Sequence, residues 1–350
     1  ADIYRQSCLF LDILKKYTDC DHTMDQKDIM RKLTEDYDIT VDRKSIKANL
    51  DCLFDYGYEI ECTKTERIKK DGTKEIITSN WYYNHEFDDS ELRMMIDSIL
   101  FSKTIPAGQA SELIKKIAGL SNIYFTNKMT HVSSLPGLEH TSNQQTLYNV
   151  GLIDDAISEK KQISFVYNNY WEDKKLHPRR EEPYIVNPYQ MVANDGKYYL
   201  VCNYDKYDTL SNYRVDKMTQ VKIINKPAKK RDKVKGMEHG LNLPKHMAEH
   251  IYMFADEPVT IILRVKKSAI SDIVDWFGSN FDVVDESIAR QYDGFRETTD
   301  AVTYVRLVCS RQAMSHWAMQ YGTSVEVIYP TELRTQIGEA VKEMNNRYND

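Results

Sequence analysis

The sequence predicts an α+β protein built from several domains. With 350 residues, the chain is long enough for two or three domains that each bury a core. Apolar residues recur at helical spacing in much of the chain up to Lys160, short alternating runs follow from Ile163 to Ile224, and strand and helix patterns alternate beyond Val259. From these changes of pattern we expect five segments: residues 1–85, 86–145, 146–228, 229–255 and 256–350.

The composition is that of a globular protein that neither spans a membrane nor depends on disulfides. Apolar residues make up 41% and charged residues 29% of the chain, and no apolar run approaches the roughly 20 residues that cross a bilayer. No signal-peptide pattern opens the sequence, and its six cysteines are scattered without a C-x-x-C pair. We therefore expect a cytoplasmic protein without a membrane partner.

The first segment, residues 1–85, predicts three short helices followed by a β-hairpin. Thr23 and Gln26 have the spacing of a capping box, and Asp42 is a good N-cap for the third helix. An alternating run follows that helix, Asp71-Gly72 offers a tight turn, and Ile77 to Tyr83 predicts the returning strand. Three helices and a hairpin are the outline of a winged helix-turn-helix domain.

Such a domain binds duplex DNA with its third helix and its hairpin, or wing. The predicted DNA-binding residues are Arg43, Lys44 and Lys47 on the third helix, and Lys64, Arg67, Lys69 and Lys70 in the hairpin. The alternative is that these side chains are only solvated charges. Residues 1–85 hold 14 Lys and Arg against 17 Asp and Glu, so any duplex affinity depends on local clustering and should be modest and salt-dependent.

The second segment, residues 86–145, predicts a helical linker. Glu86 to Leu100 and Ala110 to Leu120 each have one apolar face, whereas Ser133 to Asn143 is rich in loop residues. We expect these helices to connect domains or to form a dimer contact.

The middle of the chain combines aromatic rings with positive charge. Nine tyrosines and Trp171 lie between Ile163 and Lys217, and residues 146–235 hold 17 Lys and Arg against 12 Asp and Glu, in a chain whose net charge is −6. Flat rings beside cations suit stacked bases that carry phosphates. The short runs here predict a small curved sheet or barrel, with strands at Ile163 to Tyr167, Tyr184 to Val186, Gln190 to Ala193, Lys197 to Asn203, Asn212 to Val215 and Gln220 to Ile224.

The order of residues within these strands resembles the WYL domain. The resemblance rests on Ile163 to Tyr167, Pro188-Tyr189, Tyr198-Tyr199-Leu200 and Tyr213 to Met218. Tyr198 stands where the family has the tryptophan of its Trp-Tyr-Leu triplet, and Lys217 stands where an arginine is common. The layout of winged helix, helical connector, WYL domain and C-terminal extension is that of WYL transcription regulators, so the resemblance covers nearly the whole chain.

The resemblance implies a small Sm-like β-barrel that senses a single-stranded nucleic acid or a nucleotide-like effector. Carried over by position, the candidate effector-binding residues are Tyr167, Tyr189, Tyr198, Arg214 and Lys217, with His177 and Arg179 in a neighbouring basic loop. For each tyrosine the alternative is a place in the barrel core with its hydroxyl satisfied. Strict alternation would also put Arg214 and Lys217 on opposite faces, unless the strand ends near Asp216.

The last two segments predict a linker and a ferredoxin-like domain. Lys226 to Lys235 is strongly charged and predicts a solvated connector, with a binding tail as the alternative. From Val259 to Ile328 the patterns follow a β-α-β-β-α-β order, and a final helix runs to about Tyr348. In WYL regulators this extension is associated with dimerisation, so the resemblance implies a homodimer.

One short motif points elsewhere. His246-Met-Ala-Glu249-His250 matches the H-x-x-E-H pattern of inverted zinc peptidases, with Glu326 as a remote third ligand. The motif lies in a short polar connector, and the chain has no P-loop, dinucleotide-binding glycines or G-x-S-x-G elbow. We therefore expect no enzyme activity, no cofactor and no metal, and keep the zinc metallopeptidase as a remote alternative.

The favoured hypothesis is a ligand-responsive, homodimeric DNA-binding transcription regulator. Its N-terminal domain would bind double-stranded DNA, and its WYL domain would sense a nucleic-acid or nucleotide-like effector. The main alternative is an RNA- or ssDNA-binding accessory protein that modulates a nucleic-acid-targeting defence system, which the weak net charge of residues 1–85 would suit.

Overall fold

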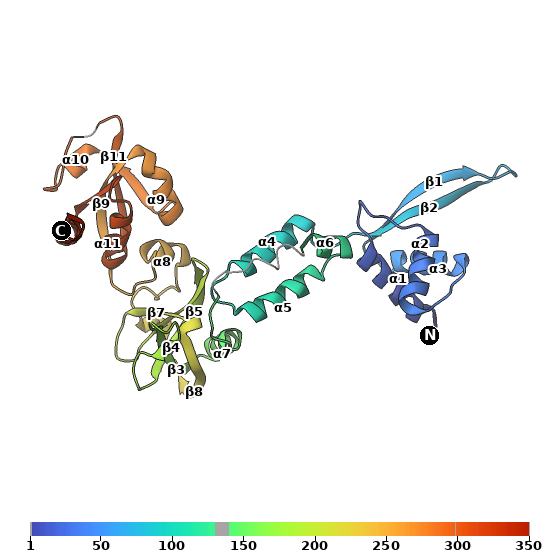
Figure 1. The fold of residues 1–350 in the computed structure, drawn as a ribbon, viewed down its shortest axis with the longest axis horizontal. Helices are drawn as coiled ribbons and strands as arrows, with labels where there is room; N and C mark the ends of the chain where they lie inside the picture. Colours follow the sequence, from blue (N-terminus) through green and yellow to red (C-terminus); the bar gives the residue numbers. More distant parts are fainter. Residues whose placement is uncertain (1, 130–139, 298, 350) are drawn as a thin grey trace. The chain divides into compact units, whose positions relative to one another are not determined.

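The computed structural model describes residues 2–129, 140–297 and 299–349 (Figure 1). The chain divides into two compact units, residues 1–141 and 142–350. Among the described residues, no helix is both long and apolar enough to cross a membrane.

The first unit opens with three helices around one core. They are α1 (Asp2–Tyr17), α2 (Gln26–Tyr37) and α3 (Arg43–Asp55), and their buried side chains include Phe10, Ile13, Leu14, Ile29, Leu33, Ile46 and Leu50. Asp42 caps α3, because its Oδ1 accepts a hydrogen bond from the Ser45 amide at 2.8 Å. The prediction that Thr23 begins the second helix is wrong: Met24 forms a β-bridge with Trp81, so the helix begins only after Asp25.

The hairpin that follows consists of β1 (Ile60–Ile68) and β2 (Lys74–Tyr83), paired antiparallel from Ile60 opposite Tyr83 to Ile68 opposite Lys74. Gly72 in the connecting turn has a φ of +82°, which glycine adopts without strain. Only Ile60 and Trp81, near the base, are buried in the core of the three helices. Most of the hairpin beyond them is exposed, and it projects from the helices in Figure 1.

Three more helices follow in the described part of the first unit. Helices α4 (Asp89–Leu100), α5 (Ala107–Ala118) and α6 (Ile123–Lys128) bury Leu92, Ile96, Ile114 and Phe125 among them. The short α6 was not predicted. Of the predicted loop from Ser133 to Asn143, residues 133–139 lie outside the described part, and residues 140–143 are neither helix nor strand.

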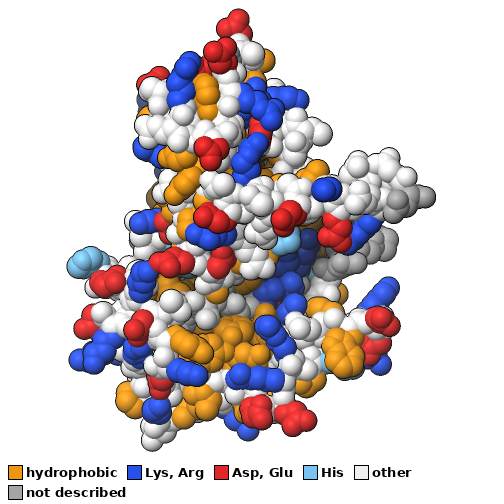
Figure 2. Space-filling model, turned by 90° about the vertical axis from the view of Figure 1, so that its left-hand side faces the viewer, with side chains coloured by type: hydrophobic (Ala, Val, Ile, Leu, Met, Phe, Trp, Pro, Cys, Tyr) orange, Lys and Arg blue, Asp and Glu red, His pale blue; other side chains and the backbone are white. Residues whose placement is uncertain are grey.

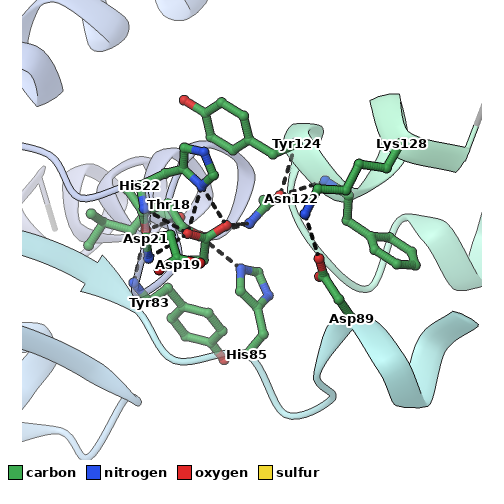
Figure 3. Close-up of polar contacts among 12 residues, drawn as sticks. Thr18, Asp19, Asp21, His22, Tyr83, His85, Asp89, Asn122, Tyr124 and Lys128 are labelled. Atoms are coloured by element: carbon green, nitrogen blue, oxygen red, sulfur yellow. Dashed lines mark hydrogen bonds and ion pairs between the residues drawn. The ribbon is translucent and has the colours of Figure 1, made fainter.

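A polar network joins the end of α1 to the start of α6 (Figure 3). Asn122 is buried; its Oδ1 accepts hydrogen bonds from the amides of Tyr124 and Phe125, and its Nδ2 donates to Asp19 Oδ2 at 2.6 Å. His22 stacks on Tyr124, with ring centroids 3.7 Å apart. Burial alone would raise the pKa of Asp19, but hydrogen bonds from His22 and Asn122 lower it below its usual value. One side chain, Asn122, therefore both caps a helix and fastens it to α1.

The second unit begins with helix α7 (Thr146–Ser158) and a curled antiparallel sheet. Its strands are β3 (Lys161–Tyr170), β4 (Leu176–Pro178), β5 (Tyr184–Asn194), β6 (Lys197–Asn203), β7 (Leu210–Arg214) and β8 (Met218–Pro227), in the order β4-β3-β5-β6-β7 with β8 paired to the other side of β3. Strand β5 pairs with β3 through Tyr184 to Val186 and with β6 through Asn187 to Asn194. Because one strand passes from one neighbour to the next, the sheet curls.

Two predictions about this sheet need correction. The strands predicted at Tyr184 to Val186 and Gln190 to Ala193 are one strand, whose register shifts at Pro188 because proline cannot donate to the ladder. Strand β4 was not predicted, since Leu176–Pro178 is too short to show a period. The more specific fold assignments, an Sm-like barrel for this sheet and a winged helix-turn-helix for the first unit, stay predictions.

The segment after β8 does more than connect. Val234 and Met237 are buried against Tyr189, and Lys229 Nζ donates to Tyr207 O at 2.9 Å. Within Lys226 to Lys235, the range predicted as a solvated connector, most side chains are exposed and Val234 is the buried one. A short helix, α8 (Leu243–Glu249), follows.

The chain ends in a four-stranded antiparallel sheet with helices. The elements are β9 (Pro258–Lys266), α9 (Ile270–Phe277), β10 (Phe281–Val284), α10 (Glu286–Ala289), β11 (Val302–Ser310), α11 (Arg311–Gln320), β12 (Val325–Tyr329) and α12 (Thr331–Asn349), and the strand order is β10-β11-β9-β12. The β-α-β-β-α-β order is as predicted, with α10 added. Two clusters of buried side chains occupy this domain, one centred on Leu263 and Trp317 and the other on Ile262 and Tyr304. Because Ile262 and Leu263 are adjacent on β9, they lie on opposite faces of the sheet, so both faces are covered.

Candidate functional site

Positively charged side chains gather where strand β7 ends. The strand stops at Arg214, and a 3-10 turn, Val215–Lys217, follows, so strict alternation does not separate Arg214 from Lys217. Arg214 forms a two-point ion pair with Asp216: Nε lies 3.1 Å from Oδ1 and Nη2 lies 2.7 Å from Oδ2. Because the Asp216 side chain is only 1% exposed, this pair fixes the guanidinium on the domain.

Lys217 lies in an unfavourable place for a cation. Burial lowers its pKa, the positive charges of Arg214, Arg179 and Lys197 lower it further, and Asp216 acts in the opposite direction. We call Arg179, Lys197, Arg214 and Lys217 the cation cluster. Bringing like charges together costs free energy. Asp195 and Asp216 offset part of this repulsion through ion pairs with Lys197 and Arg214, and a bound anion would offset more of it.

Exposed rings lie beside the cation cluster. Lys217 Nζ is 6.0 Å from the centre of the Tyr170 ring, and the next residue, Trp171, is 63% exposed. The Trp171 ring stacks on His177 with centroids 4.4 Å apart, and His177 Nε2 lies 2.8 Å from Asp173 Oδ2. This hairpin between β3 and β4 offers a flat aromatic surface next to positive charge. Figure 2 views the molecule from the left-hand side of Figure 1. In its lower part, at the height at which Figure 1 draws β3 to β8, hydrophobic side chains lie beside Lys and Arg side chains.

Two of the predicted effector-binding tyrosines are in the core. Tyr167 packs among Phe165, Tyr184 and Tyr213, and burial raises its pKa to about 12. Tyr189 is also buried, and its hydroxyl donates to Lys229 O at 2.9 Å. Both positions match the alternative stated for each tyrosine, a side chain in the core with its hydroxyl bonded, whereas Tyr198 is partly exposed.

Tyr199, which was not among the predicted effector-binding residues, lies opposite Arg214 in the sheet. Tyr199 is the register partner of Arg214 across β6 and β7, so the two side chains leave the sheet on the same face. Burial raises the pKa of Tyr199, and the positive charge of Arg214 acts in the opposite direction. That Tyr199 and Arg214 share a face follows from the pairing of β6 with β7, which cannot be derived from the order of residues alone.

In the first unit, the predicted DNA-binding residues are all exposed. Arg43, Lys44 and Lys47 lie in the first half of α3, while Asp51 and Asp55 lie exposed in its second half. In the hairpin, Lys64 Nζ is 5.1 Å from the centre of the Phe54 ring and Lys69 Nζ is 3.6 Å from Glu75 Oε1. Arg67 and Lys70 are exposed on β1 and next to the turn. The basic half of α3 and the hairpin belong to one domain.

The H-x-x-E-H motif lies beside a cavity of about 510 Å³ that is lined from β7, from α8 and from the segment before β9. His246 is buried, and burial together with nearby His250 lowers its pKa to about 4. His250 Nδ1 is 2.7 Å from Phe254 O, so it donates to the main chain. Within residues 2–129, 140–297 and 299–349, no three His, Cys, Asp or Glu side chains are grouped so that they could hold a metal ion.

Two segments of the chain match known domain families. Residues 149–223 match the WYL domain, and residues 257–344 match the WCX domain. The first match runs from within α7 into β8, and the second runs from the segment before β9 into α12. The comparison with curated proteins found no match.

Two solved structures are similar in part. The proteasome accessory factor B/C (PafBC) of Arthrobacter aurescens is 14% identical with a TM-score of 0.28; the match covers 99% of this chain and 49% of PafBC. A CRISPR Cas-related protein is 13% identical with a TM-score of 0.39, over 90% of this chain and 76% of its own. The chain thus spans about half the length of PafBC.

Proposed function

Because the chain carries a WYL domain followed by a WCX domain, we propose that it is a ligand-responsive, DNA-binding transcription regulator without enzyme activity. In this proposal the N-terminal three helices and hairpin act as a winged helix-turn-helix that binds duplex DNA. The WYL domain senses a single-stranded nucleic acid or a nucleotide-like effector. The protein acts as a homodimer.

The observation that carries the proposal is the cation cluster with exposed rings beside it. Lys217 is held among like charges, and Tyr170 and Trp171 present flat faces next to it. A strand of nucleic acid supplies both partners, since its phosphates neutralise cations and its bases stack on rings. A purely structural role would not require a lysine in a position where its charge is destabilising.

Duplex binding is assigned to the first half of α3 and to the hairpin. In helix-turn-helix proteins, the N-terminal residues of the recognition helix contact base edges. Arg43, Lys44 and Lys47 occupy that part of α3, and Asp51 lies one turn beyond Lys47. The helix therefore has a polarity, with a basic end suited to phosphates and an acidic end that repels them.

The effector must bind two arrangements of the dimer with different affinity, since a ligand that binds both equally shifts nothing. Release of charge repulsion at Lys217 would stabilise whichever arrangement brings phosphates to the cation cluster.

Fluorescence anisotropy with labelled oligonucleotides tests the proposal. We expect Arg43→Ala and Lys47→Ala to weaken duplex binding about tenfold each and to leave single-strand binding unchanged. Asp51→Asn is the matched variant on the same helix, and it should strengthen duplex binding. Equal duplex affinity in the wild type and all three variants would overturn the role given to α3.

The RNA- or ssDNA-binding accessory protein stays the second candidate. Residues 1–85 carry three more acidic than basic side chains, 17 against 14, which does not favour binding to duplex DNA. Under this reading, single strands bind through the WYL domain and no duplex binds specifically. The same titrations decide, with Arg214→Ala as the variant that should weaken single-strand binding under either reading.

A further inference from the structure

Three arginines of the C-terminal domain surround one glutamate. Arg334 Nη2 lies 2.8 Å from Glu326 Oε1, Arg296 Nη2 lies 3.6 Å from the same oxygen, and Arg264 Nη1 lies 3.8 Å from Glu326 Oε2. We call Arg264, Arg296 and Arg334 the arginine triad. Glu326 is the carboxylate with which all three form ion pairs, so the group carries a local charge of +2.

Each member of the triad is held by its own support. Arg264 on β9 is the register partner of Glu326 on β12. Arg334, in the first turn of α12, donates to Val327 O at 2.7 Å. Gly294 lies against it so closely that an added Cβ would be 3.1 Å from Arg334 Cζ. The glycine therefore leaves room for the guanidinium.

The support of Arg296 comes from its main chain. The buried Tyr304 hydroxyl donates to Arg296 O at 2.6 Å and accepts from Arg296 N at 3.1 Å. The backbone is therefore fixed while the side chain stays 64% exposed. A guanidinium on a fixed backbone loses less entropy when it binds a ligand.

The triad is larger than its structural task requires. Of the three arginines, Arg334 ties α12 to β12 by hydrogen bonds to Val327 O and Glu326. Exposed ion pairs contribute little to stability, so Arg296 adds little to the fold by its charge. Arg264 Nε is buried and has no hydrogen-bond partner. Arg264 and Arg296 approach Glu326 only to 3.8 and 3.6 Å, beyond hydrogen-bond distance, so both keep donors for a ligand, and all three guanidinium groups are at least partly open to solvent.

We propose that the arginine triad is a receptor for a phosphate monoester dianion. Three guanidinium charges less one carboxylate leave +2, and a phosphate monoester carries about −1.5 to −2 at neutral pH. Guanidinium forks match phosphate oxygens in geometry, and Arg is the residue that binds them in two-point contacts. The ligand is a free nucleoside monophosphate or the terminal phosphate of a strand. This site lies in the WCX domain and is separate from the cation cluster.

Binding of AMP and of adenosine to the full chain, measured by calorimetry, tests this site. We expect Arg296→Ala to weaken AMP binding about tenfold and to leave adenosine binding unchanged. Glu326→Gln should strengthen AMP binding, because it removes the carboxylate that competes with the phosphate. Arg306→Ala is the matched control: Arg306 is 47% exposed in the same sheet but is paired one-to-one with Asp282 at 2.9 Å.

The outcomes separate this site from the WYL domain. AMP binding that is lost in Lys217→Ala but unchanged in Arg296→Ala would overturn the triad, as would an equal loss in Arg296→Ala and Arg306→Ala. Binding that falls in Arg296→Ala but not in Lys217→Ala would support the triad and count against the effector role of the cation cluster. Oligonucleotides with and without a 5′-phosphate then distinguish a strand end from a free nucleotide, and circular dichroism checks that Glu326→Gln is folded.

Discussion

At the scale of single residues, Lys217, which we propose binds the effector, opposes the stability of the folded protein. Burial and the charges of Arg214, Arg179 and Lys197 all lower its pKa, so the protonated lysine destabilises the folded state. Because the folded pKa lies below the unfolded value, this cost is present at neutral pH and disappears as the pH rises above the folded pKa. A lysine whose charge destabilises the fold is better explained by a role in ligand binding than by a role in stability.

We therefore expect Lys217→Gln to raise the free energy of unfolding at neutral pH and to weaken single-strand binding about tenfold. Chemical denaturation and fluorescence anisotropy measure the two effects. Lys222→Gln on β8 is the control, since Lys222 is exposed and should change neither quantity. A variant that lost stability together with affinity would instead make Lys217 a structural residue.

The pKa of His246, like that of Lys217, is lowered by burial and by a neighbouring side chain. Burial lowers its pKa to about 4, with a further contribution from His250, whose ring centroid is 4.5 Å away. The unfolded chain takes up a proton at a higher pH than the folded one, so stability is retained above the unfolded pKa and is lost as the pH falls toward the folded value.

Between about pH 7 and pH 5, protonation of His246 should cost about 2 kcal/mol of unfolding free energy. Urea unfolding at the two pH values measures this difference in unfolding free energy, and we expect it to be smaller by about that amount in His246→Gln. His239→Gln, at an exposed position near the same cavity, is the control. An unchanged difference in His246→Gln would assign the acid sensitivity to other groups, such as His250.

At the scale of elements, Asn122 is a joint between two parts of the first unit. Its Oδ1 caps α6, and its Nδ2 donates to Asp19 and to Thr18 O at the end of α1 (Figure 3). Helix α6 has only six residues, so it depends on this cap and on burial of Phe125 rather than on its own propensity.

Asn122→Ala should cost about 2 kcal/mol or more in unfolding free energy, because it removes the cap and leaves Asp19 with fewer donors. Asn122→Asp keeps an oxygen for the cap but places a carboxylate against Asp19, so it should also destabilise. Adding Asp19→Asn to Asn122→Asp should restore part of the loss. A double-mutant cycle by denaturation measures this coupling, and strictly additive effects would show that the contact carries no energy.

Elements were predicted best where one chain segment carries the whole pattern. The α3 helix and its Asp42 cap, the turn at Gly72 and the strand at Phe281–Val284 could all be predicted from neighbouring residues. Strand β5 could not be predicted whole, because Pro188 interrupts the alternation and the strand is held by two different neighbours. A bridge to Trp81 likewise decided where α2 begins.

At the scale of the whole molecule, charge separates the proposed activities. The chain has a net charge of −6, so binding to nucleic acid depends on local groups of cations and should be steeply salt-dependent. We assign duplex binding to α3, which lies in the first unit, and single-strand binding to the cation cluster, which lies in the second unit.

We expect the slope of log K against log salt for duplex binding to decrease by about one for each of Arg43→Ala and Lys47→Ala. Lys217→Ala should leave the duplex slope unchanged and reduce the single-strand slope by about 0.7. Titrations at several salt concentrations measure both slopes. If Lys217→Ala altered the duplex slope as much as Lys47→Ala does, the division of roles between the two units would be wrong.

The sequence by itself determined the kind of protein: an α+β chain with helices first, a basic and aromatic middle that resembles the WYL domain, and a β-α-β-β-α-β end. These follow from periods and motifs within short stretches. The tertiary structure alone decided which side chains meet: Tyr167 and Tyr189 enter the core, Tyr199 faces the side of Arg214, and Glu326 gathers Arg264, Arg296 and Arg334. The reason is physical, since register and packing join residues far apart in the chain, and no local pattern records those contacts.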